Sequence, residues 1–87
     1  MGLDIKAMIV DDSMTIRKII KTNLDKMGIN NVLEAGDGEA ALRLLAANTD
    51  TGILFLDYNM PILNGFQTVK KMREYPNLAH IKIVMVS

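Results

Sequence analysis

Short apolar runs alternate with segments of helical periodicity along this chain, and that alternation limits the available folds more than any other feature of the sequence. Four runs rich in apolar residues are strand candidates, namely residues 7–10, 32–35, 53–56 and 81–86. Three intervening segments carry apolar side chains at helical spacing, namely residues 14–27, 39–47 and 65–74. A strand–helix unit that occurs three times and is followed by a strand predicts an α/β fold, in which helices cover both faces of a parallel sheet.

Helical spacing also predicts which side chains face the sheet. For the first helix these are Ile16, Ile19, Ile20, Leu24 and Met27. For the second helix they are Ala41, Leu42, Leu44 and Leu45, and for the third they are Phe66, Val69 and Met72. The predicted N-caps, whose side chains can accept hydrogen bonds from the first helical turn, are Ser13 or Asp12, Asp37 and Asn64.

The composition excludes several classes of function. The chain of 87 residues has room for one domain with one core, and its ten basic residues balance ten acidic ones. Zero net charge argues against a nucleic-acid-binding protein, and the lack of cysteine excludes disulfides and thiolate chemistry. We expect no membrane contact and a cytoplasmic location, because Asp4 and Lys6 interrupt any signal-like stretch and no uncharged run could span a bilayer.

Polar residues follow three of the predicted strands at the edge where open α/β sheets bind ligands. Asp11 and Asp12 follow the first strand, Asp57 follows the third, and Ser87 follows the fourth. If the first and third strands are neighbours, three carboxylates converge there. Such a cluster raises the pKa of its members and opposes folding unless a cation lies among them. Oxygen ligands of this kind suit Mg²⁺.

A helix-capping role is the competing interpretation of these acidic residues, because an aspartate after a strand is more often a cap than a catalyst. Asp12 and Ser13 could both cap the first helix. Asp57, however, ends the most apolar strand, and no helix is predicted to begin for roughly seven residues after it. Taken together, the acidic pair and Asp57 favour a metal site over a set of caps.

Two motifs give the chain a family resemblance. The sequence Asp57-Tyr58-Asn59-Met60-Pro61, followed by Asn64-Gly65, resembles the phosphoacceptor loop of response-regulator receiver domains, and Asp11-Asp12-Ser13 resembles their acidic pair. Within that family the chain is similar to the single-domain, chemotaxis-type (CheY-like) regulators. The resemblance implies a flavodoxin-like, doubly wound sheet with strand order 2-1-3-4.

The resemblance also implies a role for each site residue. Asp57 would accept a phosphoryl group from a histidine kinase or a phosphotransfer protein, and Ser87 would donate a hydrogen bond to that group. Asp11, Asp12, Asp57 and the backbone carbonyl of Asn59 would hold Mg²⁺. The signal would pass to a downstream protein by a conformational change, without turnover of a separate substrate. The chain would then be a signalling domain and not an enzyme.

Pro61 and Gly65 are expected to shape the loop after Asp57, Pro61 by fixing φ and Gly65 by permitting a backbone geometry that a side chain would forbid. The basic residues of the first helix, among them Arg17, Lys18 and Lys21, are interpreted as a solvated face, with a docking role as the weaker alternative. Met60 is expected to serve only in packing.

The family pattern continues beyond the fourth strand with a helix, a strand and a further helix. We therefore interpret residues 1–87 as a receiver domain without that portion, and expect self-association through an exposed strand at residues 81–86 and a bare sheet face. Two alternatives follow. One is a folding or assembly module without working phosphotransfer. The other is a phosphohydrolase of the haloacid-dehalogenase type, which would place a second aspartate two residues after Asp11, where this chain has Ser13.

Overall fold

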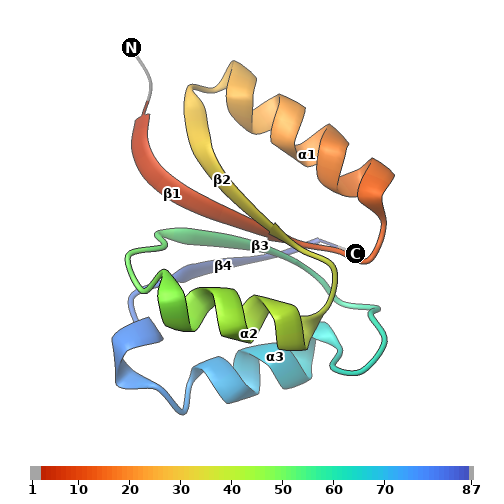
Figure 1. The fold of residues 1–87 in the computed structure, drawn as a ribbon, viewed down its shortest axis with the longest axis vertical. Coiled ribbons are helices and arrows are strands. Elements are labelled where there is room, and N and C mark those ends of the chain that lie inside the picture. The colour runs from red at the N-terminus through yellow and green to blue at the C-terminus, as the bar shows by residue number, and fades with distance from the viewer. Residues whose placement is uncertain (1–2, 87) are drawn as a thin grey trace.

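The computed structural model describes residues 3–86, in which strands and helices alternate in the predicted order (Figure 1). The strands are β1 (Leu3–Val10), β2 (Ile29–Ala35), β3 (Ile53–Asp57) and β4 (Lys82–Val86). The helices are α1 (Met14–Lys26), α2 (Gly38–Ala47) and α3 (Gly65–Met72), and a short 3₁₀ helix, η1 (Pro76–Leu78), precedes β4. None of the helices described is long and apolar enough to cross a membrane.

All strand pairs are parallel, and the sheet order is β2-β1-β3-β4, which confirms the order implied by the resemblance. β1 lies between β2 and β3, with Val10 paired to Ala35 on one side and to Leu56 on the other. A strand in this central position is covered on both faces, and residues 7–10 of β1 are completely buried.

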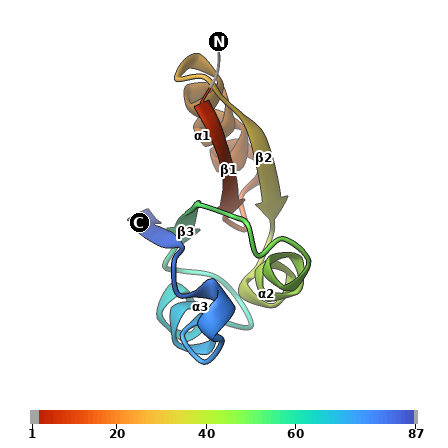
Figure 2. The ribbon, with the colours of Figure 1, turned by 90° about the vertical axis from the view of Figure 1, so that its left-hand side faces the viewer.

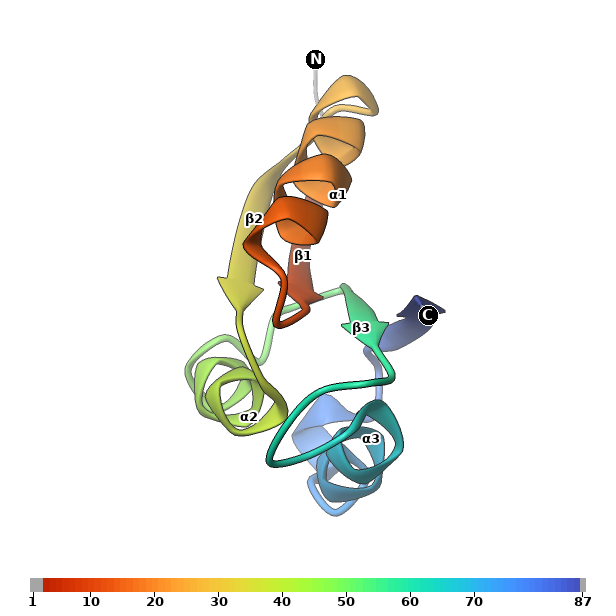
Figure 3. The same ribbon diagram turned by 90° about the vertical axis from the view of Figure 1, so that its right-hand side faces the viewer.

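The two faces of the sheet are covered unequally. α2 and α3 lie on one face, where they enclose the larger core cluster, and α1 lies on the other (Figures 2 and 3). Leu24 of α1 packs against Ala7 and Ile9 of β1, whereas Phe55 of β3 is only partly buried on that side. Val84 of β4, which pairs with Phe55, is 40% exposed. In the part of the chain described, α1 therefore covers β1 and β2 on its face of the sheet. On that same face it leaves β3 and β4 largely exposed.

The partial cover of the sheet by α1 explains why several residues predicted to face inward from the first helix are exposed. Ile16 and Ile19 are exposed, Met27 is 63% exposed, and Phe66 at the start of α3 is 62% exposed. Helical periodicity gives the direction of an apolar stripe but not the width of the surface that it meets. Since α1 contacts only part of the sheet, Leu24 is its one buried residue.

Two strands begin earlier than predicted, because the sheet accommodates the polar residues at their starts. β2 starts at Ile29 and includes exposed Asn30 and Asn31, which is possible because β2 is an edge strand. In β1, Lys6 is accommodated by a side-chain network in which its Nζ donates to Asn48 Oδ1 at 3.0 Å and to Asp50 Oδ1 at 2.9 Å.

Candidate metal centre

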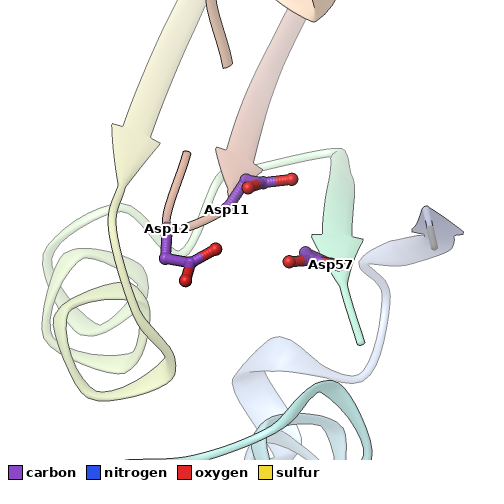
Figure 4. A group of neighbouring side chains, drawn as sticks. All are labelled: Asp11, Asp12 and Asp57. Atoms are coloured by element: carbon purple, nitrogen blue, oxygen red, sulfur yellow. The ribbon is translucent and has the colours of Figure 1, made fainter. Parts of the chain in front are cut away.

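Three carboxylates meet at the carboxyl edge of the sheet (Figure 4). Asp11 and Asp12 belong to the turn between β1 and α1, and Asp57 is the last residue of β3. Each offers one oxygen, and these oxygens all lie within 4.8 Å of one another. The convergence follows from the topology, because β1 and β3 are parallel neighbours and their carboxyl ends lie side by side.

The turn that carries Asp11 is short and held by several hydrogen bonds. The backbone amide of Asp11 donates to the Ala35 carbonyl at 3.1 Å. The side-chain Oδ1 of Asp11 accepts from the backbone amide of Ser13 at 2.8 Å. Ser13 in turn caps α1, since its Oγ accepts from the Ile16 amide at 3.2 Å. Because Ser13 is the cap, Asp12 has no capping role, and its exposed carboxylate points toward the other two (Figure 4).

The loop after Asp57 is longer, and it returns to the strand that it leaves. The Gly65 amide donates to the Tyr58 carbonyl at 2.8 Å, so that α3 begins against the end of β3. A Cβ at position 65 would lie 2.9 Å from the Asp57 carbonyl oxygen and 3.0 Å from Tyr58 Cα. Gly65 therefore permits a close backbone approach that a side chain would forbid, as expected. The left-handed conformation in this loop belongs to Ile62, at φ 72°.

The electrostatics of the cluster favour a bound cation. Burial raises the pKa of Asp57, and the negative charge of Asp11 and then of Asp12 raises it further, while the backbone amides of Asn59 and Tyr58 lower it. Within residues 3–86, no lysine or arginine forms an ion pair with any of the three carboxylates. Three clustered carboxylates without a basic partner fit a hard divalent cation, which prefers oxygen ligands.

The other predicted site residues are placed as follows. Asn59 lies in the exposed loop with its backbone amide facing the Asp57 carboxylate, and the role of its carbonyl stays a prediction. Ser87 lies outside the described residues. Met60 is partly buried against the main core, which confirms its packing role. Neither Asp57 nor Asp12 caps a helix, since Ser13 and Asn64 cap the helices that follow them.

The structure also shows a contact to the site that sequence reasoning missed. Arg17, interpreted above as part of a solvated face, donates from Nη1 to the backbone carbonyl of Asp11 at 2.6 Å. The position of Arg17 in the sequence could have predicted this contact. Arg17 lies one helical turn after the cap Ser13, and long side chains on a helix extend back toward the N-terminus, here toward the acidic turn.

Comparison with known proteins agrees with this geometry. The sequence model described as response regulator receiver domain matches residues 7–87, so the chain belongs to that family. It is 45% identical over 82 residues to chemotaxis protein CheY1 of Helicobacter pylori, an alignment that covers 94% of this chain and 66% of that protein. It is 44% identical to the CheY homolog of Campylobacter jejuni, over 94% of this chain and 63% of that protein.

Solved structures show the same fold. The crystal structure of Vibrio cholerae chemotaxis protein CheY4 aligns with a TM-score of 0.83 at 32% identity, over 93% of this chain and 66% of that chain. The chain thus spans about two thirds or less of these relatives. The flavodoxin-like receiver fold and membership of a two-component signalling family are shown by these likenesses together with the strand order.

Proposed function

We propose that the chain is a phosphoacceptor switch of two-component signalling, of the chemotaxis type, in which Asp57 accepts a phosphoryl group in a Mg²⁺-dependent reaction. The observation that carries the proposal is the convergence of three carboxylate oxygens within 4.8 Å, one of them on Asp57, whose pKa is raised. Asp57 is also partly exposed and followed by a loop, whereas Asp11 is buried.

In this reaction the carboxylate oxygen of Asp57 attacks phosphorus, and the bond between phosphorus and the donor's imidazole nitrogen breaks. The electron pair of that bond returns to the imidazole, and Asp57 becomes an acyl phosphate that water later hydrolyses. Asp11, Asp12, Asp57 and the Asn59 carbonyl would hold Mg²⁺. The cation would supply positive charge where a carboxylate approaches the negative phosphoryl oxygens.

The proposal includes the partners. The phosphodonor is a histidine kinase or a phosphotransfer protein, in the cytoplasm, and a downstream protein reads the modified state. Family membership and the likeness to CheY proteins support this interpretation. Because Asp57 is itself the acceptor and is regenerated by hydrolysis, no separate substrate is turned over. In the same proposal Ser87 donates a hydrogen bond to the phosphoryl group.

A second function, assembly, is favoured by the exposed sheet edge. Val84 and Met85 of β4 are 40% and 45% exposed, and within residues 3–86 β4 pairs with β3 alone. Apolar edge strands of this kind pair with other chains. We propose self-association through β4 and the bare face beside it. Multi-angle light scattering should give a mass above that of one chain, and a monomer at all concentrations would contradict it.

The phosphoacceptor proposal is tested by intact-mass spectrometry after incubation with acetyl phosphate and Mg²⁺. We expect a single phosphoryl adduct in the wild type, none in Asp57→Asn, and none when EDTA removes the metal. Asp50→Asn is the matched control, because it makes the same chemical change at an exposed aspartate that Lys6 pairs with, outside the cluster. An adduct that persists in Asp57→Asn, or none in folded wild-type protein, would refute the proposal.

A further inference from the structure

Arg17 connects the acidic turn to the end of the neighbouring strand β2. Its guanidinium donates twice, from Nη1 to the Asp11 carbonyl oxygen at 2.6 Å and from Nε to Glu34 Oε1 at 3.1 Å. The side chain is only 16% exposed, so its aliphatic part is packed as well. A long side chain with two directed hydrogen bonds and little exposure is held in one conformation.

Glu34 of β2 binds the guanidinium of Arg17 at Nε rather than at the Nη1 atom that contacts the acidic turn. Its Oε1 accepts from Arg17, and its Oε2 lies 3.6 Å from Lys21 Nζ, so two basic residues of α1 hold one carboxylate of β2. Gly36 follows two residues later, and a Cβ there would meet Arg17 Nη1 at 3.7 Å, an ordinary contact distance. The guanidinium thus lies between the β1–α1 turn and the end of β2.

We propose that Arg17 is a positioning residue for the cation site, and that it holds the Asp11–Asp12 turn in the geometry in which both carboxylates reach Asp57. The inference rests on the proposed function. Its physical basis is that the carbonyl of Asp11 belongs to the peptide group joining Asp11 to Asp12. Fixing that carbonyl limits the rotation of this peptide group, and so fixes where the Asp12 side chain points relative to Asp11.

The charge of Arg17 makes the inference testable by sign. A guanidinium next to the acidic turn repels a cation, so removing it should tighten Mg²⁺ binding if charge were its only effect. A positioning role predicts the opposite result, weaker binding. Lysine in place of arginine keeps the charge but cannot donate two hydrogen bonds in the fixed directions of the guanidinium, so charge alone predicts no change for Arg17→Lys.

The experiment is a Mg²⁺ titration of the wild type, Arg17→Met and Arg17→Lys, followed by amide NMR shifts of residues in the β1–α1 turn. Arg43→Met is the matched control, since Arg43 also pairs with a glutamate, Glu39 at 3.7 Å, on the exposed surface of α2. We expect the dissociation constant to rise about tenfold in Arg17→Met, as for the loss of other outer-shell groups, and by a smaller factor in Arg17→Lys. Arg43→Met should bind as the wild type does.

Each outcome decides the inference. Unchanged or tighter binding in Arg17→Met would overturn it, even if that variant melts at a lower temperature, because a merely structural role lowers stability without changing the affinity for Mg²⁺. If Arg17→Met does not fold, Arg17→Lys decides by the same criterion. Absence of Mg²⁺ binding by the wild type would overturn the proposed function together with this inference. Normal wild-type binding that no variant alters would overturn the inference alone.

Discussion

The two segments that supply the acidic cluster are built in opposite ways. The β1–α1 turn passes from strand to helix within residues 11–13, and hydrogen bonds from Ser13 and Arg17 hold Asp11 within it. The β3–α3 loop also connects a strand to a helix, but it is longer and comprises residues 58–64. Tyr58 and Ile62 in this loop are exposed. The first segment is short and held by side-chain hydrogen bonds, whereas the second is longer and more exposed.

Backbone strain sharpens this contrast. The Leu63 amide donates to the Pro61 carbonyl at 2.8 Å across Ile62, whose φ is 72°. This is the γ-turn with positive φ, which is rare and strained, above all for a β-branched residue. A tight turn that holds buried Asp11 suits the binding of a cation, whereas a strained loop beside Asp57 suits a change on phosphorylation. Under the proposed function, we therefore expect the first segment to support the metal ligands and the second to respond to phosphorylation.

Gly65→Ala tests the close contact by which the longer loop returns to β3, and it should have the largest effect on stability. The added Cβ would lie 2.9 Å from the Asp57 carbonyl oxygen and 3.0 Å from Met85 Sδ. We expect a loss of about 1–3 kcal/mol in the free energy of unfolding, measured in urea, together with slower phosphoryl uptake. Gly36→Ala is the control, since its Cβ meets only Arg17 Nη1 at 3.7 Å, and a loss as large there would contradict the argument.

The two helix caps provide a second comparison. Asn64 forms a capping box. Its side-chain Oδ1 accepts from the backbone amide of Gln67 at 2.8 Å, and its own backbone amide donates to Gln67 Oε1 at 2.9 Å. Ser13 accepts a single bond from the Ile16 amide at 3.2 Å. We expect Asn64→Ala to cost about 1–2 kcal/mol and Ser13→Ala about 0.5–1 kcal/mol by thermal unfolding. The reverse order would show that the short turn depends more on its cap.

Asp57→Asn should stabilise the metal-free protein. Because the folded pKa of Asp57 lies above its ordinary value of 3.8, the folded state binds more protons than the unfolded state between these two values. The contribution of Asp57 to stability therefore increases as the pH falls through that window, and at neutral pH its charge is destabilising. We expect Asp57→Asn to add about 0.5–1 kcal/mol at neutral pH, measured by urea unfolding.

Asp50 and added Mg²⁺ supply the controls for that measurement. The pKa of Asp50 is lowered by its hydrogen bond and ion pair with Lys6, so Asp50→Asn should reduce stability, and the contribution of Asp50 is lost as the pH falls through its folded pKa. At about 100 times its dissociation constant, Mg²⁺ should stabilise the wild type by about 2.7 kcal/mol and so reverse its order with Asp57→Asn. A stabilised Asp50→Asn would contradict this assignment of signs.

Of these substitutions, Ile62→Gly should change the free energy of unfolding least, and it should stabilise the protein. Glycine adopts positive φ without strain, so the relief at position 62 should exceed the entropy that glycine loses on folding, for a net gain of about 0.5 kcal/mol. Asn59→Gly, in the same exposed loop but without a positive φ, should lose about 0.5–1 kcal/mol. Chemical denaturation of both variants would test this, and destabilisation by both would argue against strain at Ile62.

The sequence was informative where a single physical rule applies. Alternating periodicities predicted the elements, and the rule that parallel strands end at one edge predicted that Asp11, Asp12 and Asp57 would converge if the first and third strands were neighbours. The strand order and the site roles came from the family resemblance, and of these the order is confirmed. The capping alternative for Asp12 is resolved by one hydrogen bond, from the Ile16 amide to Ser13 Oγ.

Features that depend on distant parts of the chain could not be predicted. The exposure of Met27 depends on how much of the sheet the first helix covers, which local periodicity does not encode. The role of Arg17 depends on Glu34, seventeen positions later in the sequence, being brought beside it by the pairing of β2 with β1. The left-handed Ile62 could not be predicted, because a β-branched residue is among the last expected to adopt positive φ.

The central claim is that Asp57, and neither residue of the acidic pair, accepts the phosphoryl group. The direct measurement is to treat the chain with acetyl phosphate and Mg²⁺, reduce the acyl phosphate with borohydride, and map the resulting homoserine by peptide mass spectrometry. The account predicts homoserine at position 57 alone, dependent on Mg²⁺. Homoserine at position 11 or 12, or at no position in folded protein, would contradict it.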